Sequence, residues 1–270
     1  EITDDTINTI FVSEMLIDCK GKVDPQNYID YLLNWVSENP ERSDYVSGPS
    51  TKRAIDLIEQ GVPINQSGLE GTTNGSAMKI SPIGIIYNYE QIEELIDQVE
   101  AICMPTHYNG VSISGASAIA ACVSYAIRGG KDIDEMWNIA IETAKKAESR
   151  GPQLPSASIA KRLEKVRADI KNKEEEYAIN LLQDIYGTGV EIVETIPAVL
   201  TIITLSNLDP VRASQIAAGI GGDTDTIGAI SGAICGAVNP CFPEEDINLL
   251  FKVNDLPFER LTEGLNSLIK

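Results

Sequence analysis

Histidine is almost absent from this 270-residue chain, which has a single one, and its five cysteines include no CxxC pair. A zinc site built from cysteine and histidine ligands is therefore excluded. The cysteines are scattered and odd in number, a pattern typical of reduced thiols, so we expect a cytoplasmic protein. Neither GxxxxGK(S/T) nor GxSxG occurs, which excludes a P-loop and the nucleophile elbow of the α/β-hydrolases.

Basic residues are also scarce: 21 lysines and arginines stand against 40 acidic residues, giving a net charge of −19. This excess repels phosphates, so we expect neither stable nucleic-acid binding nor adsorption to an anionic membrane. The most apolar run, residues 196–205, is far shorter than the ~20 residues that span a bilayer. A small anionic ligand stays compatible with the charge, because a bound cation reverses the field locally. The composition gives no indication of the oligomeric state.

Alternating strand patterns of useful length are missing, and apolar residues recur instead at helical spacing. The first stripe starts at Ile7, after an acidic segment in which Thr3 or Asp4 is a natural N-cap. Further helices are predicted over residues 28–36, 52–59, 90–102, 116–127, 134–147, 157–186 (as one helix or two), 211–218, 227–238 and 258–268. Predicted loops cover residues 61–76, 110–117, 149–158 and, as a cleft lining or an ordinary connection, 186–197. The fold we expect is all-α, a single compact multi-helix domain over residues 1–270.

Two short segments concentrate carboxylates and hydroxyls: TDDT at residues 3–6 and GGDTDT at residues 221–226. Hard oxygen donors at this density suit Mg²⁺ or Mn²⁺. If the fold brings both segments together, their four carboxylates repel one another unless cations neutralise them, so the pair predicts a divalent-metal site. An EF-hand is excluded, because position 234 is Ile where that loop needs Glu. Taken alone, GGDTDT could also be a glycine turn capped by aspartate.

Glycine returns every fourth residue in the helix predicted after GGDTDT, at Gly228, Gly232 and Gly236. Each glycine costs a helix roughly 1 kcal/mol relative to alanine. Close approach of another helix to this smooth side is the compensation we expect, which would place the helix in the centre of the bundle. Its N-terminal N–H groups would then stabilise nearby anions. The alternative is an ordinary core helix rich in small residues.

Four motifs come in a fixed order: TDDT, NGSAMK at residues 74–79, THYN at residues 106–109, and GGDTDTIGAISGAICGA at residues 221–237. Together they resemble the ADP-ribosylglycohydrolase family. That family includes hydrolases of ADP-ribosylarginine and ADP-ribosylserine and the enzyme that reactivates dinitrogenase reductase. The resemblance spans nearly the whole chain and implies an orthogonal helix bundle of the family type with two Mg²⁺ (or Mn²⁺) ions. THYN alone would be a weak signal, whereas GGDTDT with its small-residue helix is specific.

The resemblance also assigns residues to roles. The metal ligands that it implies are Thr3, Asp4, Asp5, Asp223, Asp225 and Thr226. Asn74, Gly75 and Ser76 match a glycine-rich loop whose backbone N–H groups face the ligand's diphosphate. His107 matches the histidine on the ribose and diphosphate side of the cleft, although a lone histidine is as readily a structural residue. Lys79 stands where an arginine is common, which keeps the charge but loses the bidentate fork.

Family members open with a segment of the form GDAxG followed by Glu, and no such segment occurs in these residues. A role carried by that segment in the family therefore cannot be assigned to any residue of this sequence. Because only three residues precede Asp4, we expect further residues before Glu1.

The chemistry that the resemblance implies is hydrolysis at the ribose C1 of an ADP-ribosyl group carried by a protein or a small molecule. Breaking this bond builds oxocarbenium character at C1, and a metal-activated water completes the reaction. Asp5 and Asp225 are the candidate general bases that orient the water, with Asp4 and Asp223 more purely ligands.

Two alternatives stay open. One is a hydrolase of the same fold that acts on another ribosyl or glycosyl bond. The other is a metal-binding family member without turnover, which the six intact ligand positions disfavour. An adenine-binding pocket, which Tyr87, Tyr108 or Tyr186 could supply, would separate ADP-ribosyl substrates from the rest.

Overall fold

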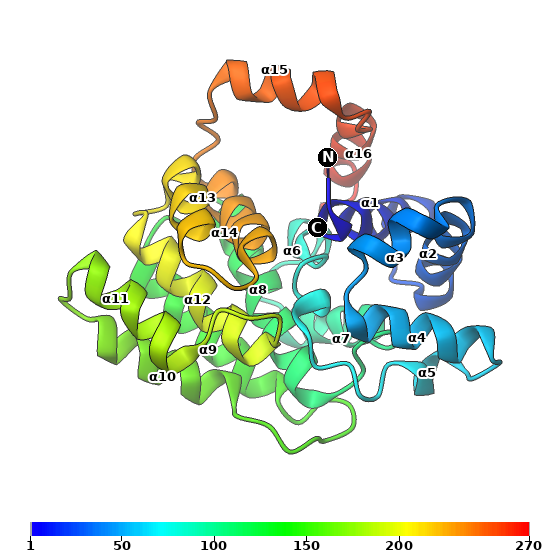
Figure 1. Cartoon of the computed structure of the whole chain (residues 1–270), viewed down its shortest axis with the longest axis horizontal. Helices are drawn as coiled ribbons and strands as arrows, with labels where there is room; N and C mark the ends of the chain where they lie inside the picture. Colours follow the sequence, from blue (N-terminus) through cyan, green and yellow to red (C-terminus); the bar gives the residue numbers. More distant parts are fainter. Residues whose placement is uncertain (1, 270) are drawn as a thin grey trace.

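The computed structural model describes residues 2–269, which are built from helices without a β-strand (Figure 1). The α-helices of these residues are α1 (Asp4–Asp18), α2 (Pro25–Glu38), α3 (Pro40–Val46), α4 (Pro49–Glu59), α5 (Ile64–Ser67), α6 (Ser81–Ile86), α7 (Ile92–Cys103), α8 (Gly110–Ile127), α9 (Ile133–Ala147), α10 (Ile159–Ile170), α11 (Glu175–Leu181), α12 (Ile192–Leu205), α13 (Pro210–Gly219), α14 (Thr224–Val238), α15 (Glu244–Val253) and α16 (Phe258–Asn266). A 3₁₀ turn, η1 (Asn74–Ser76), and a π-helical segment, η2 (Leu182–Tyr186), accompany them. The predicted all-α fold class is confirmed.

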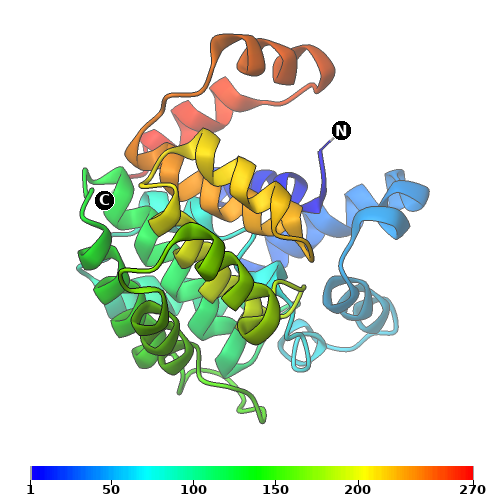
Figure 2. The same ribbon diagram turned by 60° about the vertical axis from the view of Figure 1, so that its left-hand side comes forward.

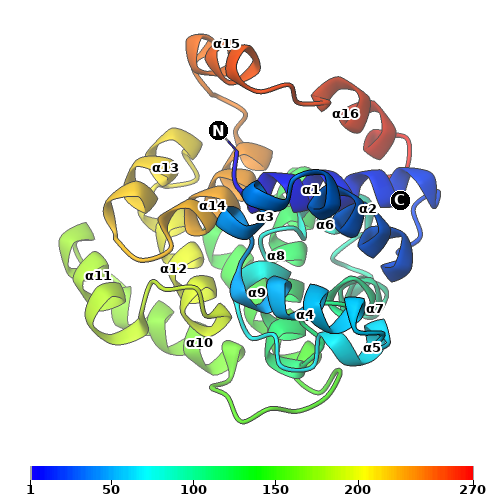
Figure 3. The ribbon, with the colours of Figure 1, turned by 45° about the vertical axis from the view of Figure 1, so that its right-hand side comes forward.

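Helix α8 runs through the middle of the molecule and packs against α6, α7, α9 and α14 (Figures 1 and 3). The Asn109 side chain caps its start by accepting a hydrogen bond from the Ser112 N–H at 3.1 Å. Gly115 allows close packing, because a Cβ there would overlap the Ile192 side chain. By length and composition α8 could cross a membrane, but 94% of it is buried inside the protein. It is a core helix, and the loop predicted over residues 110–117 is wrong.

Helix α12 contains Pro197 in its interior and begins at Ile192, so the loop predicted over residues 186–197 is wrong in its second half. Proline removes the N–H that would pair with the carbonyl four residues earlier, that of Val193. The Arg162 Nε of α10 donates to this carbonyl at 2.7 Å, and the same guanidinium also donates to the Tyr186 carbonyl. A neighbouring helix therefore satisfies the backbone group that the proline leaves unpaired.

The long charged stretch over residues 157–186 divides into α10, α11 and η2. Asn172 adopts a left-handed conformation with φ 58° between α10 and α11. Asparagine tolerates this conformation better than most residues, and it ends the first helix. The alternative of two helices is the correct one here.

Helices α3, α5, α6 and α15 are not revealed by apolar periodicity. Two of them are short helices with a proline in the first turn, Pro40 in α3 and Pro82 in α6. The fixed φ of proline suits that position, where its missing N–H would be unpaired anyway. In so short a helix this proline is the only local signal.

Helix α14 packs with α13 on one side and with α8 and α12 on the other. A Cβ at Gly228 would lie 3.4 Å from the Ala217 Cβ of α13, and one at Gly232 would lie 3.7 Å from the Ser214 Oγ. The close approach predicted for the glycine side is therefore present, with α13 as the partner. The glycine side itself is only half-buried, so α14 does not lie in the centre of the bundle, which α8 occupies.

Helix α15 has no buried residue and stands clear of the main body, joining α14 to α16 (Figures 1 and 2). Helix α16 returns to pack on α1. A Cβ at Gly264 would overlap the Ile17 side chain, so glycine allows the two helices to approach. Buried apolar side chains form one continuous cluster from Ile7 to Leu265. This continuity favours the single-domain organisation, which stays a prediction.

We expect the change Arg162→Met to lower the free energy of unfolding by about 1–3 kcal/mol, because two carbonyls lose their donor. Urea denaturation measures the effect. Arg167→Met on the same helix is the matched control, since Arg167 pairs at the surface with the exposed Asp134 and should change stability by less than about 1 kcal/mol. Equal effects of the two changes would contradict the role given to Arg162.

Candidate active site

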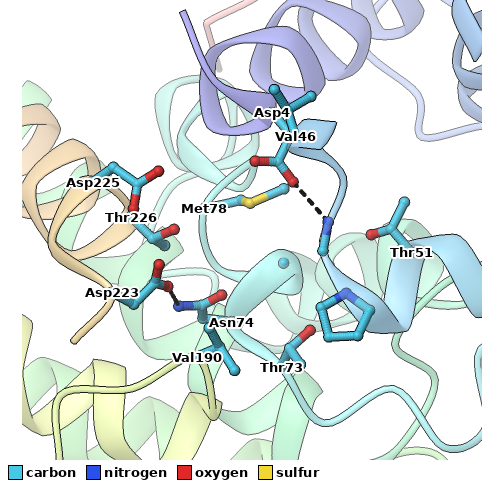
Figure 4. Close-up of a pocket in the computed structure, with 13 residues that line it drawn as sticks. Asp4, Val46, Thr51, Thr73, Asn74, Met78, Val190, Asp223, Asp225 and Thr226 are labelled. Atoms are coloured by element: carbon cyan, nitrogen blue, oxygen red, sulfur yellow. Dashed lines mark hydrogen bonds between the residues drawn. The ribbon is translucent and has the colours of Figure 1, made fainter. Parts of the chain in front are cut away.

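A cavity of about 180 Å³ lies where the first turns of α1 and α14 face each other (Figure 4). Asp4 comes from α1, while Asp223 and Asp225 come from the start of α14. The remaining walls are the loop before α4, with Gly48, and the segment with Asn74 before α6. The two acidic motifs, far apart in the sequence, therefore meet at one cavity.

The first turn of α1 fixes its two carboxylates by different donors. The Thr3 hydroxyl donates to Asp5 Oδ2 at 2.7 Å, and the Gly48 N–H donates to Asp4 Oδ2 at 3.2 Å. Thr3 is the N-cap residue by backbone geometry but makes no side-chain capping bond. Its hydroxyl orients Asp5 instead.

Two glycines in the left-handed conformation shape the start of α14. Gly221 has φ 74° and Gly222 has φ 75°, a region that favours glycine. A Cβ at Gly222 would also overlap the Thr188 carbonyl, to which the Asp223 N–H donates at 2.7 Å. The glycines of GGDTDT thus let the chain turn tightly enough to direct Asp223 into the cavity.

The neighbouring Asn74 side chain holds Asp223 in place. Its Nδ2 donates to Asp223 Oδ2 at 2.5 Å and to the Thr195 hydroxyl at 2.9 Å (Figure 4). The Asn74 N–H donates to the Val190 carbonyl at 2.8 Å. Asn74, which the resemblance places in the loop facing the ligand's diphosphate, therefore also positions a predicted metal ligand with its side chain.

His107 and Ser76 lie behind the cavity wall rather than in it. His107 is completely buried, and a Cβ at Gly75 would stand only 2.9 Å from its Nε2, so the loop rests directly on the imidazole ring. Burial, with Lys79 adding to it, lowers the pKa of His107 well below its usual range and keeps the ring neutral. The buried Ser76 hydroxyl donates to the Ser112 carbonyl at 3.3 Å. Of the predicted substrate residues, Asn74 and Gly75 line the cavity.

Several residues of the cavity wall belong to no motif. They include Val46, Gly48 and Thr51 near α4, and Thr73 before η1. Of these four residues, only Thr73 could have been expected at the cavity from the sequence, because it directly precedes NGSAMK. Among the described residues the cavity lining includes no aromatic side chain, so the structure does not bring Tyr87, Tyr108 or Tyr186 to it.

Burial and mutual repulsion make the acidic cluster unfavourable when it is fully ionised. Burial, and to a smaller extent the charge of Asp5, raises the pKa of Asp4 from 3.8 to about 7. Burial also raises the pKa of Asp5 to about 6, with the Thr3 hydroxyl opposing the shift and Asp225 adding to it. The pKa of Asp223 is raised too, again by burial first. Positive charge is what this cluster lacks.

The donor set fits a hard divalent cation. Asp5 Oδ1 is buried and has no hydrogen-bond partner among the described residues, which is costly for a carboxylate oxygen. Carboxylates and hydroxyls from α1 and α14 are the ligand types that Mg²⁺ and Mn²⁺ prefer. Within residues 2–269 no three Asp, Glu, His or Cys side chains already converge closely enough to hold one ion.

Comparison with known proteins agrees with the fold and the motifs. The family model described as ADP-ribosylglycohydrolase matches residues 1–267. The chain belongs to the ADP-ribosylglycohydrolase family. It is 33% identical over 276 residues to the uncharacterised protein YegU of Escherichia coli (strain K12), an alignment covering 98% of this chain and 80% of YegU.

More distant relatives are consistent with this family membership. The chain is 25% identical over 201 residues to the ADP-ribosylhydrolase ARH3 of Xenopus tropicalis, covering 67% of this chain and 55% of that protein. A solved structure titled "ADP-ribosylglycohydrolase-related protein complex" matches with a TM-score of 0.67 at 20% identity. It covers 100% of this chain and 82% of the other, which shows that the fold is shared.

We expect the metal-free protein to lose stability as the pH rises from about 5 to about 8. Asp4 and Asp5 have a higher pKa in the folded state than the ordinary 3.8, so over this range the folded state holds more protons than the unfolded chain. Its free energy of unfolding therefore falls as they ionise. Thermal denaturation in chelator at several pH values measures the slope, and added Mn²⁺ should raise the melting temperature most at pH 8. Asp4→Asn, neutral throughout, should flatten the slope; a slope unchanged in that variant would contradict the explanation.

Proposed function

We propose that this protein is a divalent-cation-dependent hydrolase that cleaves the glycosidic bond at C1 of the ribose in an ADP-ribosyl group. The observation that carries the proposal is the meeting of Asp4, Asp223 and Asp225 around one cavity, with Asp5 buried beside Asp4 and one of its carboxylate oxygens unpaired among the described residues. Membership of the family supports the reaction type. The acceptor that carries the ADP-ribosyl group is a protein or a small molecule.

Two Mg²⁺ or Mn²⁺ ions would be held by both helix starts. The residues in question are Thr3, Asp4, Asp5, Asp223, Asp225 and Thr226. Bound there, the cations would neutralise the charge of the carboxylates and, as Lewis acids, would lower the pKa of water.

Asp225 and Asp5 differ in their exposure and therefore suit different roles in the reaction. Asp225 is exposed and lines the cavity, so a water molecule can reach it, and it is the better placed general base. Asp5 is buried, does not line the cavity and is held by Thr3, which suits a residue that acts as a ligand.

Hydrolysis of another ribosyl or glycosyl bond is the second candidate, and the cavity favours it in one respect. At about 180 Å³ it is smaller than the roughly 300–1,000 Å³ of typical ligand pockets, and no aromatic side chain among the described residues lines it. The cavity suits the reacting ribose, while an adenine would have to bind outside it.

Calorimetric titration of ADP-ribose, with Mg²⁺ and again after chelation, tests the function. We expect metal-dependent binding with a dissociation constant in the micromolar range or below.

Asp225→Ala should abolish turnover of an ADP-ribosylated substrate and also weaken metal binding, because the same residue is proposed to serve as general base and as metal ligand. Near-normal turnover in Asp225→Ala would overturn the assignment of that residue. Absence of ADP-ribose binding by a metal-loaded protein would favour the second candidate.

We expect Asn74→Ala to weaken Mn²⁺ binding by roughly 10- to 100-fold, the usual effect of removing a partner that orients a metal ligand. Asp223 loses the amide that donates to it at 2.5 Å. Calorimetric Mn²⁺ titration of chelator-treated protein is the measurement. Asn34→Ala, at an exposed position of α2, is the control and should bind as the unmodified chain does. Unchanged Mn²⁺ affinity in Asn74→Ala would show that Asn74 has no part in holding Asp223.

A further inference from the structure

A buried ammonium group lies behind the cavity without a carboxylate partner. Lys79 is 1% exposed, and its Nζ donates to the Thr106 hydroxyl at 3.0 Å and to the Tyr28 hydroxyl at 3.1 Å. Burial lowers the pKa of Lys79 to about 8, so the amine is still mainly protonated at neutral pH. An ammonium group has donors only, which fixes the direction of every hydrogen bond that it makes.

That direction passes through Thr106 to the imidazole of His107. The Thr106 hydroxyl is buried and lies 2.8 Å from His107 Nδ1. If Nδ1 carried a proton and donated it, the hydrogen of the Thr106 hydroxyl would have no acceptor among the described residues. Buried polar hydrogens are rarely left unpaired. Thr106 therefore donates to an unprotonated Nδ1, and the proton of this neutral ring is on Nε2.

The last step reaches the cavity. His107 Nε2 lies 3.0 Å from the Thr73 hydroxyl, so the Nε2–H donates and the Thr73 oxygen accepts. The Thr73 hydroxyl then keeps its own hydrogen for another partner. Thr73 lines the cavity (Figure 4), which makes a ligand the available acceptor.

We propose that Thr73 contacts the substrate by donating its hydroxyl hydrogen to a ligand oxygen, and that Lys79 is the positioning residue that sets this direction through Thr106 and His107. The ligand oxygen belongs to a phosphate or to a ribose hydroxyl, and this identification rests on the proposed function. If these hydrogen bonds ran in the opposite direction, Thr73 would offer the ligand an acceptor, which suits an anionic ligand poorly.

The ring and the ammonium group are held so that this direction is kept. A Cβ at Gly75 would lie 2.8 Å from His107 Cε1, so the loop covers the ring closely. On the other side the Tyr28 hydroxyl accepts from Lys79 and donates to Asn8 Oδ1 at 2.7 Å. The Asn8 amide in turn donates to the Asp4 carbonyl at 2.9 Å. One ammonium group is thus connected both to the cavity wall and to the first turn of α1.

His107 is the single histidine of the chain, so one imidazole accounts for the whole histidine NMR spectrum. In ¹⁵N-histidine-labelled full chain, long-range ¹H–¹⁵N correlation should show protonated Nε2 and unprotonated Nδ1 at neutral pH. Lys79→Met should weaken or reverse this tautomer preference, whereas the exposed Lys145→Met should leave it unchanged. Protonated Nδ1 in the unmodified chain would overturn the proposal without reference to any ligand.

Calorimetry on the same protein tests the contact with ligand. Thr73→Val should weaken ADP-ribose binding by about five- to tenfold, the usual effect of one lost hydrogen bond, and Thr73→Ser should restore it. A parallel titration with AMP locates the acceptor: a loss with both ligands places it in the shared nucleotide part, and a loss with ADP-ribose alone places it in the remainder. Melting temperatures confirm that each variant is folded.

Undiminished affinity of folded Thr73→Val for both ligands would overturn the proposed contact. Absence of ADP-ribose binding by the unmodified protein would instead count against the proposed function. The NMR result would still decide the direction of the hydrogen bonds from Lys79 to Thr73. The two failures are therefore distinguishable.

Discussion

Repulsion between carboxylates drawn from the two ends of the chain is the constraint on which the site depends. Asp4 and Asp5 at the start of α1 lie near Asp223 and Asp225 at the start of α14. Burial raises the pKa of Asp4 and that of Asp5, and the nearby charge of Asp225 adds to both shifts. This arrangement opposes folding, and the continuous apolar core from α1 to α16 supplies the stabilisation that offsets it. A cluster that the fold must hold against its own repulsion, beside a cavity, is the arrangement expected of a functional site rather than of a structural one.

One short loop, residues 187–191, connects the parts of the site to each other. Its Thr188 carbonyl accepts from the Asp223 N–H at 2.7 Å, and another of its carbonyls accepts from the Asn74 N–H at 2.8 Å. The Glu194 carboxylate of α12 accepts from a loop N–H at 2.8 Å and so fixes the loop on that helix. The acidic turn and the cavity wall therefore rest on the same loop, and Asn74 also donates directly to Asp223.

Local patterns in the sequence predict the long helices and both acidic segments, because periodicity and motif composition are local properties. They fail where a distant group decides the outcome. A loop is predicted as far as Pro197, yet α12 begins at Ile192 and continues through the proline, since Arg162 of another helix pairs with the carbonyl left free. His107 carries the chemistry expected of a ligand-contacting residue, but Gly75 covers the ring and Thr73 stands between it and the cavity. Only the packing of separate segments determines which of these side chains faces the ligand.

A chain with a net charge of −19 can bind an anionic ligand only where its field is reversed locally. Acidic side chains face the cavity from two sides, the starts of α1 and α14, and cations bound between them would reverse the sign of the field (Figure 4). The wall made by residues 73–75 has no exposed positive charge, because Lys79 behind it is buried and His107 is kept neutral. In the proposed function this wall contributes hydrogen-bond donors, which would orient a ligand without competing with the cations for it. If the proposed function is correct, charge neutralisation and orientation are supplied by different groups, and an acidic protein could recognise phosphate and ribose oxygens without a basic surface.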